Sequence, residues 1–242
     1  MLSVVIPAHN EAENLPPLIA EVSGALDGVI SYELIVVDDG SSDETLQRLS
    51  ELARQMPTLR VVRHRNCCGQ STSLMTGIDA ATKAWIATLD GDGQNDPKDL
   101  CQMMETARNS ATPNVMVIGH RQKRKDSAWR LFCSRVANGV RSFLLKDETP
   151  DSGCGIKLFP REAFLKFPRF DHMHRFMPAL MRRVGGDVIS FPVNHRPRQS
   201  GSSHYGTMGR LFAGIIDLAG VSWLMLRTRR PQLEGNPQRD DE

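Results

Sequence analysis

Long apolar runs, aromatic residues and net charge are all scarce in this 242-residue chain. No stretch of 18 uncharged apolar residues occurs, so no conventional membrane-spanning segment is expected. Phe, Trp and Tyr make up 6% of the residues, and 30 basic residues nearly balance 28 acidic ones. This balance argues against a uniformly basic nucleic-acid-binding protein, and the 40% of hydrophobic residues argues against a disordered chain.

Cysteine is also scarce, and its spacing indicates neither disulfide bonds nor a metal site. The five cysteines are an odd number without a CxxC pair, so neither a disulfide framework nor a zinc site is predicted, and a reducing compartment is favoured. We expect the adjacent Cys67 and Cys68 to be small buried apolar residues. No secretion signal fits ahead of a strand that is predicted to begin at residue 2.

Apolar runs alternate with helical periodicity through the first half of the chain. Strands are predicted at 2–6, 34–37, 59–62, 85–89 and 115–118. Helices are predicted between them, from about residue 12, after Asp43, at 71–82 and at 97–108. This alternation is typical of βαβ units and predicts an α/β protein with a mainly parallel sheet flanked by helices.

The second half of the chain follows another pattern, and residues 120–141 are rich in Arg and Lys. The predicted elements are helices at 127–145, 175–184 and 211–226, strands at 153–159 and 188–193, and a disordered polar tail at 231–242. The charge is correspondingly uneven. Residues 1–110 hold 8 basic and 16 acidic residues, whereas residues 111–242 hold 22 basic and 12 acidic ones.

Two acidic stretches follow predicted strands. Asp38 and Asp39 come after the second strand, and Asp90 and Asp92 come after the fourth. Because ligands of parallel sheets bind beyond the carboxyl ends of the strands, both stretches are candidate sites. Carboxylates two residues apart, together with substrate phosphates, suit Mg²⁺ or Mn²⁺. The structural alternative for the first stretch is a polar turn with Asp43 as the helix N-cap.

Several motifs together resemble those of a known enzyme family. Three runs resemble the family 2 glycosyltransferases with the GT-A fold: Val4-Val5-Ile6-Pro7-Ala8-His9-Asn10-Glu11, Asp38-Asp39-Gly40-Ser41-Ser42-Asp43 and Asp90-Gly91-Asp92-Gly93-Gln94. Three later runs are similar to the dolichol/polyprenol-phosphate mannosyltransferase branch: Arg130-Leu131-Phe132-Cys133-Ser134-Arg135, Asp151-Ser152-Gly153-Cys154-Gly155-Ile156-Lys157 and Arg198-Gln199-Ser200-Gly201-Ser202-Ser203-His204. The match runs in order through about residues 2–210.

The resemblance implies a GT-A (nucleotide-diphospho-sugar transferase) fold with a mainly parallel, Rossmann-like sheet. It also implies inverting transfer of a hexose-type sugar from GDP-mannose or a UDP-sugar to a polyprenyl phosphate. Asp92 and Gln94 would hold Mg²⁺ or Mn²⁺, and Asp90 would face the donor. The other donor-binding residues would be Pro7, Ala8, Glu11, Asp38, Asp39 and Gly91, and the catalytic set would be Asp90, Asp92, Asp151 and Arg198.

The resemblance assigns phosphate and acceptor contacts to Arg121, Arg130, Ser134, Arg135, Arg198, Ser203 and His204. His204 stands where Lys is common in the family, which would make this contact weaker or pH-dependent. A lipid phosphate is already largely ionised near neutral pH, so Asp151 is expected to orient charge rather than to act as an obligatory base. If a sugar hydroxyl were the acceptor, a base role for an Asp would become the leading hypothesis.

We expect residues 1–210 to form the catalytic domain, with a nucleotide-binding half at 1–119 and an acceptor-binding half at 120–210. The apolar segment 211–226 would reach about 24 Å as a helix, short of a hydrocarbon core of roughly 30 Å. Trp223 and the flanking arginines favour a helix over 211–230 that lies on the cytoplasmic face of the membrane. The alternative is a buried amphipathic core helix, or a dimer helix that joins copies of the chain in a homo-oligomer.

Three other functions are alternatives to this one. The same fold could transfer sugar to a carbohydrate or lipid hydroxyl in cell-envelope polysaccharide assembly. A nucleotidyltransferase would show a Gly-rich, Lys-bearing loop after the first strand, where this chain has His9-Asn10-Glu11. Intact Asp90, Asp92 and Asp151 argue against a non-catalytic nucleotide-binding protein. Nucleic acid is not an expected partner, because few aromatic residues accompany the basic run.

Overall fold

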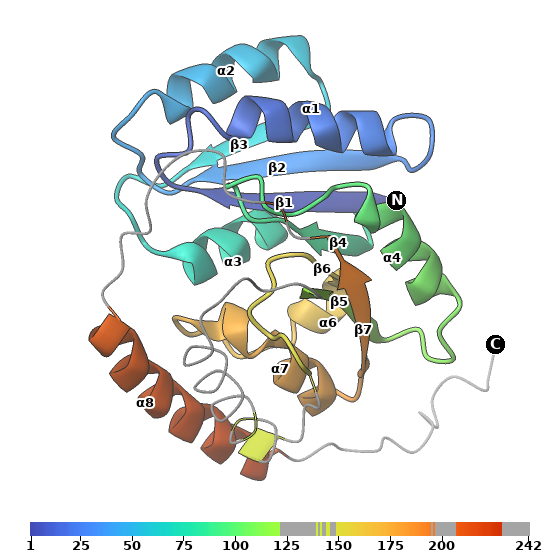
Figure 1. Ribbon diagram of the computed structural model, residues 1–242, viewed down its shortest axis with the longest axis vertical. Helices are drawn as coiled ribbons and strands as arrows, with labels where there is room; N and C mark the ends of the chain where they lie inside the picture. The colour runs from blue at the N-terminus through green and yellow to red at the C-terminus, as the bar shows by residue number, and fades with distance from the viewer. Residues whose placement is uncertain are drawn as a thin grey trace, which may run out of the picture.

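The computed structural model describes residues 1–121, 139, 141, 144–145, 149–194, 196 and 207–228, the last range by its backbone alone up to residue 213. In this part of the chain, helices cover both faces of a seven-stranded sheet (Figure 1). The strands are β1 (Leu2–Ala8), β2 (Tyr32–Asp38), β3 (Leu59–Arg63), β4 (Trp85–Thr88), β5 (Val115–Arg121), β6 (Lys157–Pro160) and β7 (Asp187–Val193). The helices are α1 (Leu15–Leu26), α2 (Thr45–Gln55), α3 (Gln70–Ala80), α4 (Asp99–Arg108), α6 (Arg161–Phe164), the 3₁₀ helix η1 (Met173–Arg175), α7 (Met177–Arg183) and α8 (Thr207–Leu226).

The strand order is β3-β2-β1-β4-β6-β5-β7. Four neighbouring pairs are parallel: β1 with β2, β1 with β4, β2 with β3, and β5 with β7. Strand β6 is the exception and runs antiparallel to both β4 and β5. The prediction of a mainly parallel sheet flanked by helices is therefore confirmed.

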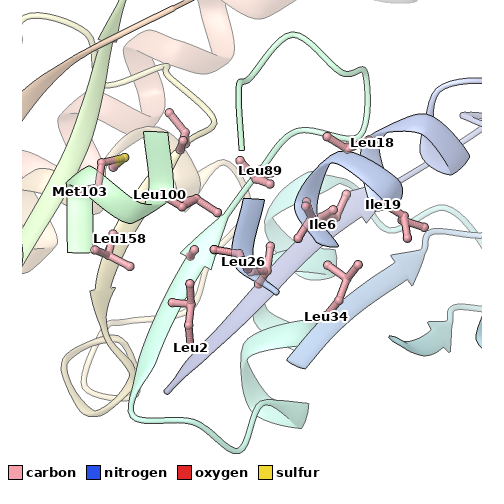
Figure 2. Packing of buried hydrophobic residues seen from close by; sticks show 14 of the residues in the cluster. Leu2, Ile6, Leu18, Ile19, Leu26, Leu34, Leu89, Leu100, Met103 and Leu158 are labelled. Carbon is pink, nitrogen blue, oxygen red and sulfur yellow. The ribbon is translucent and has the colours of Figure 1, made fainter. Parts of the chain in front are cut away.

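The central strands are apolar on both faces because helices cover both sides of the sheet. Leu2, Val4 and Ile6 of β1 face α1, and Figure 2 shows Leu18 and Leu26 of α1 packing in the same cluster. The next residue along β1, Val5, points to the opposite face and packs with α3. The continuous apolar run that predicts β1 thus reflects burial on both sides rather than alternation.

The boundaries of most elements differ from the predictions by one to four residues, and three of these differences are described here. Helix α1 begins at Leu15 rather than near residue 12, with Pro16 and Pro17 in its first turn, where proline is tolerated because the first N–H groups have no partner within the helix. The strand predicted at 153–159 begins only at Lys157. Helix α8 begins at Thr207, four residues before the predicted start, and has 20 residues. The predicted helix at 127–145 (apart from positions 139, 141, 144 and 145) and the tail lie outside the described residues.

Gly77 of α3 allows this helix to pack closely on the sheet. A Cβ atom built on Gly77 would lie 2.4 Å from Val5 Cγ1 and 3.1 Å from Val37 Cγ2. Both valines are fully buried in the sheet, so neither has free space into which it could turn. Gly24 in α1 offers the opposite case, because nothing lies within 4 Å of its Cβ position.

We predict that Gly77→Ala destabilises the protein by about 1–3 kcal/mol, because the extra methyl overpacks the junction of α3 with β1 and β2. The matched variant Gly24→Ala should instead stabilise it by about 0.5–1 kcal/mol, because alanine favours an exposed helical position. Urea unfolding monitored by circular dichroism measures both values. Equal effects of the two substitutions would contradict the close packing of α3.

Candidate functional site

The ends of several strands meet at one edge of the sheet. Strands β1, β2 and β4 are parallel and therefore end at the same edge. Strand β5 ends there too, because β4 and β5 are both antiparallel to β6. For the same reason β6 begins at this edge, and its Lys157 pairs with Thr88 at the end of β4. The acidic and basic motifs of the two halves of the chain thus come together here.

Asp90 lies partly buried just beyond the end of β4. Its Oδ1 accepts a 2.9 Å hydrogen bond from Nε2 of Gln70, and its backbone N–H donates to Oδ1 of Asn95 at 3.1 Å. Gly155 faces the carboxylate, and a Cβ atom built there would lie 2.0 Å from Asp90 Oδ2. Any side chain at position 155 would therefore displace the Asp90 carboxylate.

The Asp90–Asp92 pair fits the predicted divalent cation. Burial, and after it the charge of Asp92, raises the pKa of Asp90 to about 6, although Lys157 and Arg121 act in the opposite direction. This uncompensated negative charge is what a bound cation would relieve, and oxygen donors suit Mg²⁺ or Mn²⁺. Asp92 Oδ1 also accepts the backbone N–H of Gln94 at 3.2 Å, which holds the turn between the two predicted ligands.

Asp39 has both carboxylate oxygens engaged by the protein itself. It accepts the backbone N–H groups of Cys68 and Gly69, each at 2.8 Å, and the thiol of Cys67 at 3.3 Å. A further bond joins it to Nδ1 of His64 at 2.7 Å. Burial would raise the pKa of Asp39, but these bonds outweigh it and lower that pKa. A nucleotide contact by Asp39 would have to share these oxygens.

Cys67 and Cys68 are exposed, so the prediction that they are buried apolar residues is wrong. They lie between β3 and α3, in a loop whose backbone N–H groups bind Asp39. Burial of the sulfur atom and the neighbouring Asp39 raise the pKa of the Cys67 thiol. Asp39, His64 and Cys68 also place one potential metal-ligating atom each within 4.8 Å of one another.

Gly91 places the Asp90–Asp92 turn against the end of β1. A Cβ atom on Gly91 would lie 3.0 Å from the carbonyl oxygen of Pro7 and 3.6 Å from Glu11 Cγ. Three of the predicted donor-binding residues are therefore brought together, although they belong to segments about 80 positions apart.

Asp38, another predicted donor-binding residue, is buried in the protein rather than exposed at the site. Its carboxylate is fully buried, accepts the N–H of Ser41 at 3.0 Å, and lies 3.4 Å from Nε of Arg63. The carbonyl of Ala8 accepts the N–H of Asp39 at 2.8 Å, which joins the ends of β1 and β2. Asp38 therefore stabilises the turn after β2, and its side chain presents no surface to a ligand.

Arg121 and Asp151 form one bidentate ion pair. Arg121 Nε donates to Asp151 Oδ2 at 2.6 Å, and Nη2 donates to Oδ1 at 2.8 Å. Hydrogen bonding to Asp151 raises the pKa of Arg121, and only 6% of Asp151 is exposed. The sequence predicts separate roles for these two residues, but the structure joins them into a single rigid group.

A pocket of about 450 Å³ lies beside Asp90. Its lining residues come from α3, the end of β4, β5, the 153–157 segment and η1: Gln70, Leu74, Thr88, Leu89, Asp90, Arg121, Gly153, Gly155, Lys157, His174 and Arg175. His174 Nδ1 lies 2.7 Å from Ser71 Oγ. Burial, and after it Lys157 and Arg175, lowers the pKa of His174 to about 3, so its imidazole is neutral near pH 7.

Nine of the eleven lining residues had no predicted role, among them Gln70, Lys157, His174 and Arg175. Lys157 ends the run from Asp151 that resembles the family, so this motif was an available signal. His174 lies in η1 and also lines the pocket. Six predicted phosphate or acceptor residues lie outside the described residues: Arg130, Ser134, Arg135, Arg198, Ser203 and His204.

Arg196 ties three parts of the site together. Its guanidinium binds Glu21 Oε2 of α1 at 2.7 Å and Asp96 Oδ2 at 2.8 Å. Its backbone N–H donates to the carbonyl of Gln94 at 3.0 Å, and Gln94 Nε2 donates to the carbonyl of Arg196 at 3.3 Å. Arg196 thus holds the loop of predicted metal ligands against α1.

The fold is shared with solved glycosyltransferases of the GT-A type. The glucosyl-3-phosphoglycerate synthase of Mycobacterium tuberculosis, in complex with Mn²⁺, UDP-glucose and phosphoglyceric acid, aligns with a TM-score of 0.65 and 19% identity, over 91% of this chain and 80% of that one. Its complex with Mg²⁺ and UDP aligns over 91% of this chain and 79% of that one, also with a TM-score of 0.65. At this identity the likeness establishes the fold class, that of the GT-A enzymes.

The chain belongs to glycosyl transferase family 2, whose family model matches residues 3–167. It is 34% identical to the dodecaprenyl-phosphate galacturonate synthase of Rhizobium johnstonii over 241 residues, 95% of this chain and 69% of that protein. It is also 34% identical to the undecaprenyl-phosphate 4-deoxy-4-formamido-L-arabinose transferase of Edwardsiella ictaluri over 212 residues, 86% of this chain and 63% of that one. The chain thus spans about two-thirds of the length of these relatives, and the predictions of the family and of the GT-A fold are confirmed.

We predict that Arg196→Ala loosens the loop at 90–96, because it removes both ion pairs that hold this loop against α1. Hydrogen–deuterium exchange of peptides covering residues 89–100 should become faster, and the free energy of unfolding should fall by about 1–2 kcal/mol. The matched control is Arg169→Ala, which removes an exposed bidentate pair with Asp79. Unchanged exchange in Arg196→Ala, or an equal change in the control, would contradict this role.

Proposed function

We propose that this protein moves a hexose-type sugar from a nucleotide-diphosphate donor, GDP-mannose or a UDP-sugar, to a polyprenyl phosphate. The observation that carries the proposal is the meeting of a carboxylate pair, Asp90 and Asp92, with the basic side chains of Arg121 and Lys157 at one sheet edge. The two relatives act, by their names, on dodecaprenyl and undecaprenyl phosphates, which supports this acceptor class.

On the donor side, Asp92 and Gln94 would hold Mg²⁺ or Mn²⁺. When bound, this ion supplies positive charge that stabilises the diphosphate leaving group. Asp90 would face the transferred sugar from its fixed position between Gln70 and Gly155. Pro7, Ala8, Glu11, Asp39 and Gly91 would line the nucleotide site at the ends of β1 and β2. Asp38 would contribute only indirectly, by holding the turn that positions Asp39.

On the acceptor side, the attacking oxygen belongs to a phosphate that is already ionised near neutral pH. Orientation of two anions then contributes more to the rate than removal of a proton. The Arg121–Asp151 pair supports a role in orientation rather than in proton removal. Both carboxylate oxygens of Asp151 accept hydrogen bonds from Arg121, so Asp151 would fix the direction of the guanidinium group. Arg130, Ser134, Arg135, Arg198, Ser203 and His204 would complete the phosphate contacts.

We predict that Asp92→Ala lowers the rate of sugar transfer by about 100-fold or more, because the cation on the leaving group is lost. The assay uses radiolabelled GDP-mannose, UDP-glucose and UDP-galacturonate with undecaprenyl phosphate and Mn²⁺, followed by lipid extraction. Excess EDTA should abolish transfer by the wild type. The control Asp79→Ala, which changes an exposed carboxylate paired with Arg169, should keep its rate.

Two results would overturn the proposal. Undiminished transfer in EDTA would exclude the metal role. Label that reaches only a carbohydrate or lipid hydroxyl, and no lipid phosphate, would replace the acceptor by the alternative of cell-envelope polysaccharide assembly.

Helix α8 supports a membrane surface as a further partner. Its inner side buries Val221 and packs Leu218 and Met225 on the buried cluster that also contains Val5 and Leu74, whereas its outer side exposes large apolar side chains. These are Ile215, Ile216, Trp223 and Leu226, which are 59–85% exposed. Asp217 pairs with His172 at 2.9 Å and fixes the rotation of the helix. An exposed apolar stripe beside Arg227 suits peripheral binding to anionic lipid on the cytoplasmic face.

The length of α8 is not an argument against spanning, since 20 residues reach about 30 Å rather than the expected 24 Å. Across the described residues, however, no helix combines the length and hydropathy that crossing a bilayer requires.

We predict that Ile216→Gln with Trp223→Gln reduces binding to vesicles of anionic phospholipid at least about fivefold, because the buried apolar area is lost. Flotation of the full chain with liposomes measures this. Val29→Gln, a change at another exposed apolar residue far along the chain, should bind as the wild type does. If the wild type instead forms dimers in sedimentation equilibrium and the double variant dissociates them, the stripe is an interface between copies of the chain.

A further inference from the structure

His174 has an imidazole with one nitrogen engaged by the protein and one nitrogen left over. Its Nδ1 lies 2.7 Å from Oγ of Ser71, and its backbone N–H donates to the same oxygen at 3.3 Å. Within the part of the chain that the structure describes, Nε2 has no hydrogen-bond partner. Because His174 lines the pocket beside Asp90, this second nitrogen remains open to a ligand.

The hydroxyl group of Ser71 determines which nitrogen of His174 carries the hydrogen. Ser71 is 1% exposed, and its Oγ accepts the hydrogen bond from the backbone N–H of His174. The one other partner of this oxygen among the described residues is Nδ1 of His174, so the hydroxyl hydrogen of Ser71 is donated to Nδ1. The neutral imidazole therefore carries its own hydrogen on Nε2.

The surroundings of His174 keep the imidazole neutral. Burial disfavours the charged form, and the neighbouring Lys157 and Arg175 disfavour it further, so the pKa of His174 is lowered to about 3. Nε2–H is thus a hydrogen-bond donor that brings no positive charge to the pocket.

The first turn of α3 holds two complementary groups of the pocket. Gln70 donates to Oδ1 of Asp90 at 2.9 Å, and the next residue, Ser71, holds His174. A carboxylate that accepts hydrogen bonds and an imidazole that donates one are therefore fixed by the same turn. Hydroxyl groups match this pair, because each can donate to a carboxylate and accept from an N–H group. An anion matches it poorly, since Asp90 repels it and the neutral imidazole does not attract it.

We propose that His174 is a specificity-determining residue that donates a hydrogen bond from Nε2 to a hydroxyl group of the transferred sugar, and that Ser71 is its positioning residue. This inference rests on the proposed function, in which Asp90 faces the transferred sugar. His174 lies beyond residues 3–167, which the family model matches, so it is a contact of this chain's own second half. A sugar without the matching hydroxyl leaves the N–H donor unpaired and binds less well.

A purely structural role is the competing explanation. In that case Ser71 and His174 would only join α3 to η1, and loss of the imidazole would shift the α3 turn that holds Asp90. Binding of free nucleotides and of nucleotide sugars would then change together. A contact to the sugar predicts instead a loss that is confined to the nucleotide sugars.

Isothermal titration of the full chain with Mn²⁺ separates these explanations, with UDP, UDP-glucose, UDP-galacturonate, GDP and GDP-mannose as ligands. His174→Phe keeps an aromatic ring without the donor. It should weaken the binding of at least one nucleotide sugar about tenfold, while the affinity for the free nucleotide stays within about twofold. His174→Gln should recover most of this loss, because its amide nitrogen can take the place of Nε2. Equal changes for nucleotide and nucleotide sugar, or no change for either, would refute the contact.

Deoxy analogues of the affected sugar identify the hydroxyl group. Removal of the contacted hydroxyl should weaken binding to the wild type about tenfold and should make the wild type and His174→Phe bind equally. If His174→Phe still binds every deoxy analogue about tenfold less tightly than the wild type does, the contact is not to a hydroxyl and the proposal is wrong.

The tautomer provides a readout that needs no ligand. Two-bond proton–nitrogen correlation spectra of the full chain distinguish an imidazole with its hydrogen on Nε2 from one with its hydrogen on Nδ1. We expect the Nε2–H form for His174 in the wild type, and a mixture in Ser71→Ala together with about threefold weaker binding of the same nucleotide sugar. The matched control Ser73→Ala removes a buried hydroxyl that donates to the carbonyl of Gly69 in the same turn, and should change neither.

The two proposals can fail separately. An Nδ1–H form in the wild type, or an unchanged tautomer and affinity in Ser71→Ala, refutes the role of His174 while the nucleotide site stands. If His174→Phe does not fold, Ser71→Ala gives the decision by the same two measurements. If neither UDP nor GDP binds to the wild type with Mn²⁺, the proposed function fails, and the sugar contact fails with it.

Discussion

The antiparallel insertion of β6 between β4 and β5 is the constraint on which the rest of the site depends. Because β6 runs against its neighbours, it begins where they end, and the residues before it must cross the edge that carries Asp90. The hydroxyl of Thr88 donates to the carbonyl of Gly155 at 2.6 Å and holds this crossing segment in place. With any larger residue at 155, the segment and the Asp90 carboxylate could not share the space.

Charge explains why the two halves of the chain meet at this edge. The first half supplies carboxylates, whose mutual repulsion and burial raise the pKa of Asp90. The second half supplies Arg121, Lys157 and Arg175. Carboxylates and basic side chains gathered at one sheet edge are expected of a site that binds a cation together with several phosphate groups. The near-neutral total of the composition is therefore the sum of an acidic first half and a basic second half.

Patterns of short range in the sequence were sufficient to predict the first half of the fold. The strands β1 to β5 each contain a short apolar run, and their helices carry one apolar stripe each, so period and turn residues locate them to within a few positions. Prediction of burial failed where the exposure of a residue depends on hydrogen bonds to residues far away in the sequence. Cys67 and Cys68 have apolar character, but their loop is held open to solvent by hydrogen bonds to Asp39, some 28 residues earlier.

The sequence by itself determined the fold class and the family, since spacing of strands and of the motifs around Asp39 and Asp90 is a local property. It could not determine that Arg121 and Asp151 are one unit, that Asp38 is turned into the core, or that Arg196 holds the Gln94 loop. Nor could it reveal the pocket around Lys157. These features depend on which strands become neighbours and in which direction they run, and only the tertiary structure decides that, because it brings charges from distant segments within hydrogen-bonding distance.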